Sequence, residues 1–344
     1  MSNPSADAAA TPATAAPPSM TTHKAGRTLA TSLAILLALG AALPFFAPEH
    51  IVTAGIVVLL NCYLAQCWNL AAGYAGQFSL GHSVFIGIGG YTSTILFTKF
   101  GLSPWLGCIL GGILAAGVGT LLAMIVFRYR IKGVFFAVVT LSAAEVVRGL
   151  FENWDFVGST AGVVMVLSND PGNMMFNSRT PYFLIALAMV GLLAYGTFAM
   201  ERTRFGQYLI ALREDEDAAE ASGVPTYKCK VAVIALSAFC TAFGGTFYAQ
   251  FLLFIVPETM FSFEHVLTMM LGAMIGGAGT VIGPIVGSVI FGVLAEALRS
   301  LPFENSREIA SGARIVYALV LMVIVIKLPG GIVSLFARRQ RSGQ

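Results

Sequence analysis

Long apolar runs, separated by short polar connections, make up most of this chain. About 20 apolar residues in one helix cross the ~30 Å hydrocarbon layer of a membrane. Three of the runs, 83–98, 263–275 and 283–299, are short and adjoin glycine-rich stretches. The pattern predicts an all-α, polytopic membrane protein with ten transmembrane helices, at residues 29–47, 51–70, 83–98, 104–127, 133–150, 181–200, 231–255, 263–275, 283–299 and 309–328.

Composition agrees with this fold class. Of the 344 residues, 57% are hydrophobic and only 11% are charged, whereas soluble domains carry about 25% charged residues. The net charge of +3 is too small to indicate binding to nucleic acid. The five cysteines are odd in number and show no CxxC spacing, so they support neither a disulfide framework nor a metal site.

Three regions follow from the same pattern. Residues 1–28 are rich in Ala, Pro, Thr and Ser, which predicts a disordered cytoplasmic tail. Residues 29–332 form the transmembrane domain, with a periplasmic loop at 151–180 and a cytoplasmic loop at 201–230. Residues 333–344 form a basic cytoplasmic tail.

The distribution of positive charge predicts the orientation. If all ten segments cross and both termini are cytoplasmic, 14 of the 20 Lys and Arg residues lie inside and the other 6 outside. This is the expected positive-inside bias. Charge leaves open whether 263–299 crosses twice or is re-entrant, because both arrangements keep the same orientation. The five segments before residue 180 and the five after it could form an inverted repeat.

The densest charge cluster lies within the cytoplasmic loop, in "ALREDEDAAEASGV" (211–224). Gly206 and Gly223 bracket this stretch, which predicts one helix of about four turns with a small-residue side and an acidic side. Such a helix on the membrane surface suits docking into a groove of a partner protein. The alternative is a solvated, charged connector.

The stretch "NLAAGYAGQFSLGHSVFIGIGGY" (69–91) contains six glycines and several polar residues. At membrane depth, glycines permit either close helix packing or broken helices that line a cavity. His82 is expected near the cytoplasmic end, where a solvated or capping histidine is more common than a functional one. The candidate residues of a translocation path are Gln66, Asn69, Gln77, Ser79 and His82.

Charges inside the apolar segments are few. Glu145 and Arg148 are three residues apart on one helix face, which predicts an ion pair at the outer rim. The chain has neither a G-x-x-x-x-G-K-[ST] phosphate loop nor the HExxH and GxSxG motifs of hydrolases. The protein is therefore predicted not to be an enzyme, and any ATPase is a separate chain.

Glu216, Ala218, Ala219 and Gly223 follow the E-x-A-A…G pattern of the coupling motif of ABC-importer permeases. Over about residues 50–332 the chain resembles the branched-chain amino-acid permeases, specifically the M component of the Liv system (LivM-type). Val224 and Pro225 follow Gly223 in place of the Ile-x-Leu-Pro ending of other coupling motifs. The residues that the resemblance assigns to ATPase coupling are Arg213, Glu214, Asp215, Glu216, Asp217, Ala218, Ala219 and Gly223.

The resemblance implies a membrane permease subunit in the bacterial cytoplasmic (inner) membrane. It would form half of the path for Leu, Ile and Val delivered by a periplasmic binding protein. Implied partners are a second, LivH-type permease and two ATPases of the LivG/LivF type, which bind the ATP; this chain holds no cofactor. A homodimer stays open. The alternatives are an ABC permease for urea, short amides or aromatic acids, and, more distantly, an ion-coupled secondary transporter.

Overall fold

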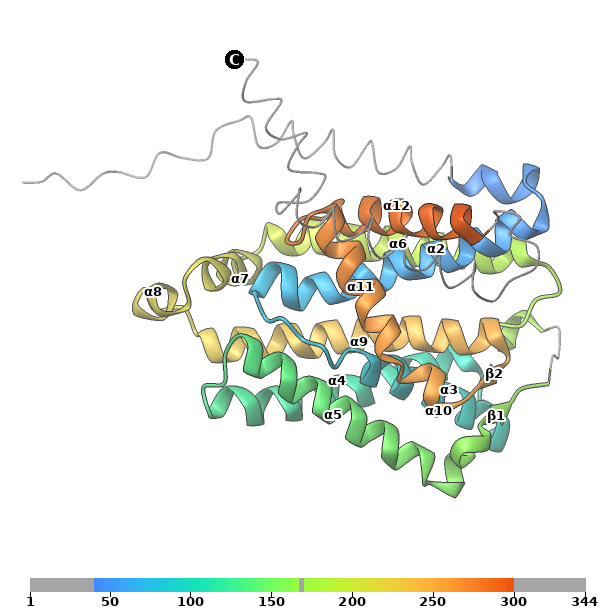
Figure 1. Cartoon of the computed structure of the whole chain (residues 1–344), viewed down its shortest axis with the longest axis horizontal. Coiled ribbons are helices and arrows are strands. Elements are labelled where there is room, and N and C mark those ends of the chain that lie inside the picture. Colours follow the sequence, from blue (N-terminus) through green and yellow to red (C-terminus); the bar gives the residue numbers. More distant parts are fainter. Residues whose placement is uncertain (1–39, 167–169, 300–344) are drawn as a thin grey trace, which may run out of the picture.

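The computed structural model describes residues 40–166 and 170–299, and these are almost entirely helical (Figure 1). Residues 40–46 are helical. The following helices are α2 (Glu49–Asn69), the π-helical turn η1 (Leu70–Tyr74), α3 (Ser83–Phe100), α4 (Pro104–Arg128), α5 (Val134–Glu152), α6 (Arg179–Glu201), α7 (Arg204–Glu214), α8 (Glu216–Ala221), α9 (Thr226–Leu252), α10 (Pro257–Met260), α11 (Phe263–Gly276) and α12 (Gly283–Arg299). Short 3-10 turns are η2 (Asp155–Val157), η3 (Ser159–Ala161) and η4 (Pro171–Asn173), and two-residue strands are β1 (Val163–Val164) and β2 (Phe254–Ile255).

Six stretches of the described residues are long and apolar enough to cross a membrane. They are α2 with η1, α4, α5, α6, α9, and α10 with α11. The prediction of a helical protein with several membrane-spanning helices is therefore confirmed. Helices α3 and α12 occupy two more predicted segments, whereas 309–328, most of 29–47 and both tails lie outside the described residues. The ten-helix count and the inverted repeat therefore stay predictions.

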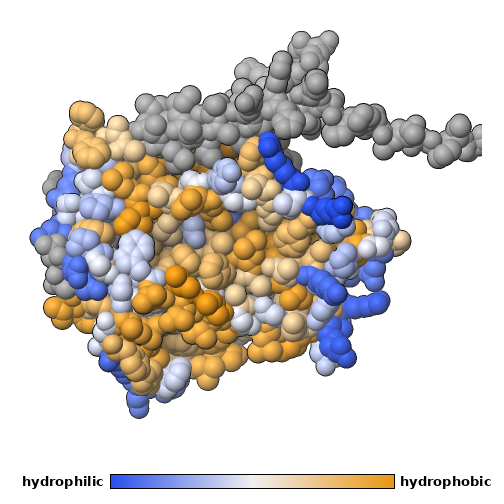
Figure 2. All heavy atoms as spheres, turned by 180° about the vertical axis from the view of Figure 1, so that it is seen from behind, coloured by the Kyte–Doolittle hydropathy of each residue, from blue (hydrophilic) through white to orange (hydrophobic). Residues whose placement is uncertain are grey.

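The bundle has two distinct ends, which the polar connections define (Figure 1). Helices α7 and α8 project at one, called here the α8 end. At the other, called the β end, β1 pairs antiparallel with β2, with Val163 opposite Ile255. The segment after α5 therefore meets the segment after α9 at the β end. Between the ends, the surface shown in Figure 2 is predominantly hydrophobic, as expected for a belt that contacts lipid.

Helix α3 packs closely against α4 and α9, and glycines make this contact possible. A Cβ atom on Gly89 of α3 would lie 2.1 Å from the carbonyl oxygen of Ala242 in α9. A Cβ atom on Gly245 of α9 would lie 2.1 Å from the carbonyl oxygen of Ile86 in α3. Because membrane helices gain little from hydrophobic burial against one another, such close backbone contact is a main source of their association.

The connection between α2 and α3 is a broken helix. After η1, residues 76–82 leave the helical path and run back from the α8 end into the bundle (Figure 1). Their polar backbone groups are satisfied by side chains: the Leu80 amide donates to Thr140 Oγ1 (3.0 Å) and Trp68 Nε1 donates to the Ser79 carbonyl (2.9 Å). A non-helical segment is tolerated at membrane depth only when protein groups satisfy its backbone in this way.

We expect Gly89→Val to weaken the bundle, because the added side chain collides with the α9 backbone. Overpacking of this kind costs about 1–3 kcal/mol. The matched control is Gly117→Val on α4, where a Cβ atom meets nothing within 4 Å. Thermal unfolding of the purified protein in detergent should show a lower Tm for Gly89→Val and an unchanged one for the control. Equal Tm values would contradict the close contact.

Candidate functional site

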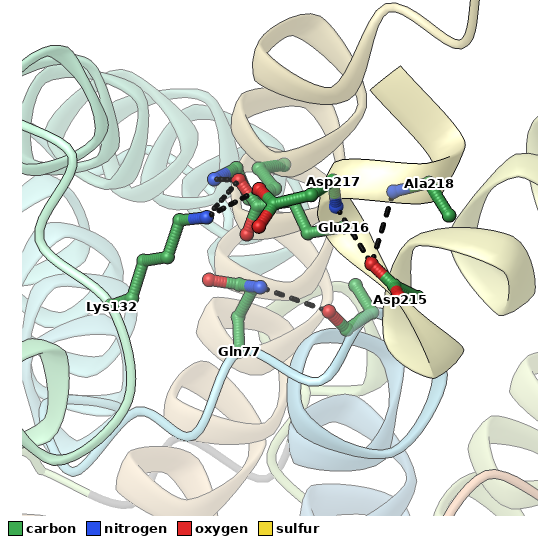
Figure 3. A network of polar contacts seen from close by, with 8 residues as sticks. Gln77, Lys132, Asp215, Glu216, Asp217 and Ala218 are labelled. Atoms are coloured by element: carbon green, nitrogen blue, oxygen red, sulfur yellow. Dashed lines mark hydrogen bonds and ion pairs between the residues drawn. The ribbon is translucent and has the colours of Figure 1, made fainter. Parts of the chain in front are cut away.

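The acidic cluster at the α8 end forms two helices, so the prediction of a single helix over 211–224 is wrong. Asp215 is extended (φ −156°, ψ 110°) between α7 and α8. Its carboxylate accepts hydrogen bonds from the amides of Asp217 and Ala218, each 3.0 Å long (Figure 3). Aspartate is a preferred residue at this capping position because it satisfies amides that lack a helical partner. The cap starts a new helix in the middle of the expected one.

Gly223 ends α8 through a backbone conformation that other residues adopt with strain. Its φ is +84°. The Val224 amide donates to the Ala219 carbonyl (3.1 Å), and the Gly223 amide donates to the Glu220 carbonyl (3.0 Å). This is the glycine-terminated capping pattern in which a left-handed residue closes the last turn. The six residues of α8 are thus fixed at both ends before α9 begins.

Glu216 attaches α8 to the membrane helices. Its Oε1 lies 2.7 Å from Nζ of Lys230, near the start of α9, and 3.5 Å from Nζ of Lys132, which precedes α5. The Glu216 and Lys230 side chains are only 19% and 6% exposed. Lys132 also binds Asp217 at 3.2 Å, and this hydrogen bond raises the pKa of the Lys132 ammonium (Figure 3). From the sequence, Lys132 and Lys230 were predicted only to lie on the same side of the membrane as the loop, and their contacts with Glu216 were not predicted.

The alanines of α8 do not share one face. Ala219 is buried and, like Leu212 of α7, points into the protein. Ala218 and Ala221 are exposed beside acidic residues. The side chain of Asp217 is 89% exposed. The helix therefore does not have the expected small-residue side and acidic side. Its inner side is attached to the protein, and its outer side carries both small and acidic residues.

Arg213, at the end of α7, reaches the broken helix. Its Nη1 donates to the carbonyl of Gly73 in η1 (3.1 Å), and its Nη2 lies 2.7 Å from the exposed carboxylate of Glu214. Tyr74, the next residue of η1, donates its hydroxyl to Glu201 at the end of α6. Two side-chain contacts thus join η1 to the base of the segment that carries α8.

A third segment, the turn between α11 and α12, meets Arg213 and η1 at the same place. The Gly279 amide donates to Asn69 Oδ1 (2.7 Å), and Asn69 Nδ2 donates to the Thr280 carbonyl (3.0 Å). A Cβ atom on Gly279 would lie 2.1 Å from Nη1 of Arg213. We call Asn69, Gly73, Arg213 and Gly279 the junction. It connects α7 to both η1 and the α11–α12 turn.

The candidate path residues lie around the broken helix, and most of them are buried. Gln66, Asn69, Ser79 and His82 are at most 3% exposed, and Gln77 is half-buried. His82 occupies the capping position of α3 but makes no side-chain cap. Its Nε2 instead lies 2.9 Å from Oγ of Ser237, near the middle of α9. The histidine is therefore neither solvated nor capping.

The two amides in this set differ in their partners. Gln77 Nε2 donates to the Ala75 carbonyl (2.9 Å) (Figure 3). Gln66 Nε2 donates to the Cys62 carbonyl (3.4 Å), while its Oε1 is buried and finds no partner among the described residues.

In the described part of the chain, no group of three His, Cys, Asp or Glu side chains could hold a metal ion.

These features define a multi-pass membrane protein in which a short, capped surface helix is attached to a broken membrane helix. Residues 48–327 match the model of the family described as "Branched-chain amino acid transport system / permease component". The chain belongs to this family of ABC-importer permeases, whose members work with ATPase and binding-protein partners.

Three relatives illustrate the range of the family. The permease LivM of Escherichia coli K12, described as part of a high-affinity branched-chain amino acid transport system, is 28% identical over 78% of this chain and 68% of its own length. The L-arabinose ABC transporter permease AraH of Azospirillum brasilense is 31% identical over 56% of each chain. The ribose import permease RbsC of Escherichia coli K12 is 24% identical over 80% of this chain and 78% of its own. No solved structure matches this chain.

We expect Gly223→Val to loosen α8, because a β-branched residue at φ +84° is strained by about 1–2 kcal/mol. Gly223→Asn is the matched control, since asparagine tolerates the left-handed region better than other non-glycine residues. Amide hydrogen exchange of peptides covering 213–230 should be faster in Gly223→Val than in Gly223→Asn. Identical exchange in both variants and the parent protein would rule out this role for Gly223.

Proposed function

We propose that this chain is one of two permease subunits of an ABC importer for the branched-chain amino acids Leu, Ile and Val. A periplasmic binding protein delivers the substrate, and separate ATPases supply the energy. The observation that carries the proposal is the α7–α8 arrangement, a capped surface helix connected through the junction to a broken membrane helix. The similarity to LivM supports the substrate class.

The orientation proposed is that the α8 end is cytoplasmic, as are both termini, in the bacterial inner membrane. Positive charges among the described residues support it. Arg128, Arg130 and Lys132 surround the connection between α4 and α5. Arg202 follows α6 and Arg204 begins α7, also at the α8 end. An excess of Lys and Arg is typical of cytoplasmic connections.

The proposed contact with a LivG/LivF-type ATPase is the outer face of α8. Asp217 and Ala218 are exposed there, while Glu216 holds the helix from behind. A short helix that is fixed on its inner side and exposed on its outer side can transmit a push or a pull without unfolding. The residues of this coupling segment are Arg213, Glu214, Asp215, Glu216, Asp217, Ala218, Ala219 and Gly223.

The movement then passes through the junction to the translocation path. Arg213 connects α7 with η1 and lies against the α11–α12 turn, so a displacement of α8 acts on both segments. The path residues Gln66, Asn69, Gln77, Ser79 and His82 surround the break that follows η1. The four buried ones would exchange partners when the path opens, and the half-buried Gln77 would contact the passing substrate.

The second permease is proposed to be LivH-type, so the transporter is a heterodimer in the membrane. One chain provides one α8, whereas the paired nucleotide-binding subunits of an ABC transporter need one contact each. A second related permease supplies the other contact and the opposite wall of the path.

A sugar importer is the second candidate, because AraH and RbsC are also similar to this chain. Uptake by a reconstituted importer distinguishes the two. The chain is co-expressed with the second permease, ATPases and binding protein of its operon, and the complex is placed in proteoliposomes. We expect ATP-dependent uptake of leucine, isoleucine and valine, with no uptake by this chain alone. Uptake of arabinose or ribose without that of leucine would overturn the substrate assignment.

A further inference from the structure

An ion pair lies on the exposed side of α5, a helix at the edge of the bundle (Figure 1). Oε2 of Glu145 and Nη2 of Arg148 are 2.8 Å apart, and these side chains are 48% and 36% exposed. Arg148 also approaches Glu152, one turn further along, at 3.6 Å. The predicted pairing is present, and in this largely apolar helix the Glu145 side chain is exposed whereas that of Arg148 is half-buried.

The pair lies deeper than the outer rim at which it was expected. Ala144, next to Glu145, belongs to a buried cluster with Ala115 and Ala238. These two alanines lie near the middle of α4 and of α9. Phe151, almost two turns beyond Glu145, packs against Phe261 at the β end, with ring centroids 4.8 Å apart. Glu145 is therefore close to the middle of the bundle, and Arg148 is one turn nearer the β end.

Polar residues continue along this face of α5. Ser142 and Glu145 are exposed, and Gly149 leaves open space where a Cβ atom would be. Their spacing of three and four residues places them on one side of the helix. We call Ser142, Glu145, Arg148 and Gly149 the α5 polar face.

Helix α4 shows what a lipid-facing surface of this protein looks like. Its exposed residues near the middle are apolar or small, namely Ile113, Leu114, Gly117 and Leu121. A single charge near the centre of a bilayer costs about 2.5–3.5 kcal/mol on insertion scales. Charged residues at that depth accordingly face protein or water, and so the α5 polar face is not a lipid contact.

We propose that the α5 polar face is a wall of the water-filled translocation path and that Glu145 and Arg148 contact the charged groups of a passing α-amino acid. This inference rests on the proposed function and adds the residues that recognise the substrate. The ammonium and carboxylate of an α-amino acid are bonded to one carbon atom. Its two opposite charges are therefore close together, as those of Glu145 and Arg148 are.

The charges are complementary in detail. Glu145 accepts hydrogen bonds from the substrate ammonium, and the planar guanidinium of Arg148 suits a carboxylate. When the path is empty, the two side chains neutralise each other across 2.8 Å. A neutral pentose has no charged group that could form an ion pair with either side chain.

Cysteine accessibility tests the aqueous location in the complete importer. Ser142→Cys and Gly149→Cys are compared with Gly117→Cys, a matched change on α4 that also meets no neighbouring atom. The five native cysteines are buried or half-buried, and the parent complex measures their background. Because a thiol reacts as the thiolate and needs water, we expect a membrane-impermeant methanethiosulfonate to label both α5 variants at least about tenfold faster than the α4 variant.

Substrate protection tests the ligand. Leucine with the binding protein and ATP should slow labelling of Ser142→Cys, and arabinose should not. Labelling at the α4 rate, or labelling that leucine leaves unchanged, would overturn the inference if the parent complex transports leucine. Leucine transport by the parent complex is a separate measurement. Its absence would count against the proposed function and not against the role of α5.

Removing both charges separates recognition from structure. Replacing both members of an ion pair by apolar residues of similar size is often neutral for stability, whereas removing one member alone is destabilising. We therefore expect the double variant Glu145→Leu/Arg148→Leu to assemble with its partners and keep its Tm, while leucine uptake falls to background. Parent-level uptake by this variant would contradict the assigned contacts.

Discussion

The need to satisfy backbone hydrogen bonds inside a membrane shapes this protein more than any other constraint. A continuous helix meets it without help, but residues 76–82 are not helical. Side chains from three different helices form hydrogen bonds with this segment. Thr140 and Trp68 bond to its backbone, and Ser237 bonds to the side chain of His82. Because each of these partners has to be in position, the break in α2–α3 also fixes how α2, α5 and α9 are placed around it.

The break has a functional consequence, since it brings backbone carbonyls and amides to a place where other segments can reach them. Arg213 binds the carbonyl of Gly73 and lies against Gly279, whose amide is held by Asn69. An intact helix from α2 to α3 would have kept the Gly73 carbonyl occupied internally. The surface helix α8, attached through Glu216, is thus connected to the membrane interior by polar contacts that can be broken and remade.

Apolar periodicity and charge were sufficient to predict the helical membrane architecture and the connected loop that carries α8. They were insufficient for the local details, which depend on contacts between residues distant in sequence. The capping role of Asp215 could have been recognised, because aspartate before Glu-Asp-Ala-Ala favours a helix start. The bonds of His82 to Ser237 and of Arg213 to Gly73 have no such signal, and neither does the mid-bundle depth of Glu145.

The central claim is that the junction carries movement from α8 to the translocation path. Its most direct test is the ratio of leucine uptake to ATP hydrolysis for Arg213→Gln in proteoliposomes that contain the complete importer. Lys228→Gln, which changes an exposed cation at the start of α9, is the control. The account predicts that Arg213→Gln hydrolyses ATP but takes up little leucine, whereas the control keeps the parent ratio. An unchanged ratio for Arg213→Gln would contradict it.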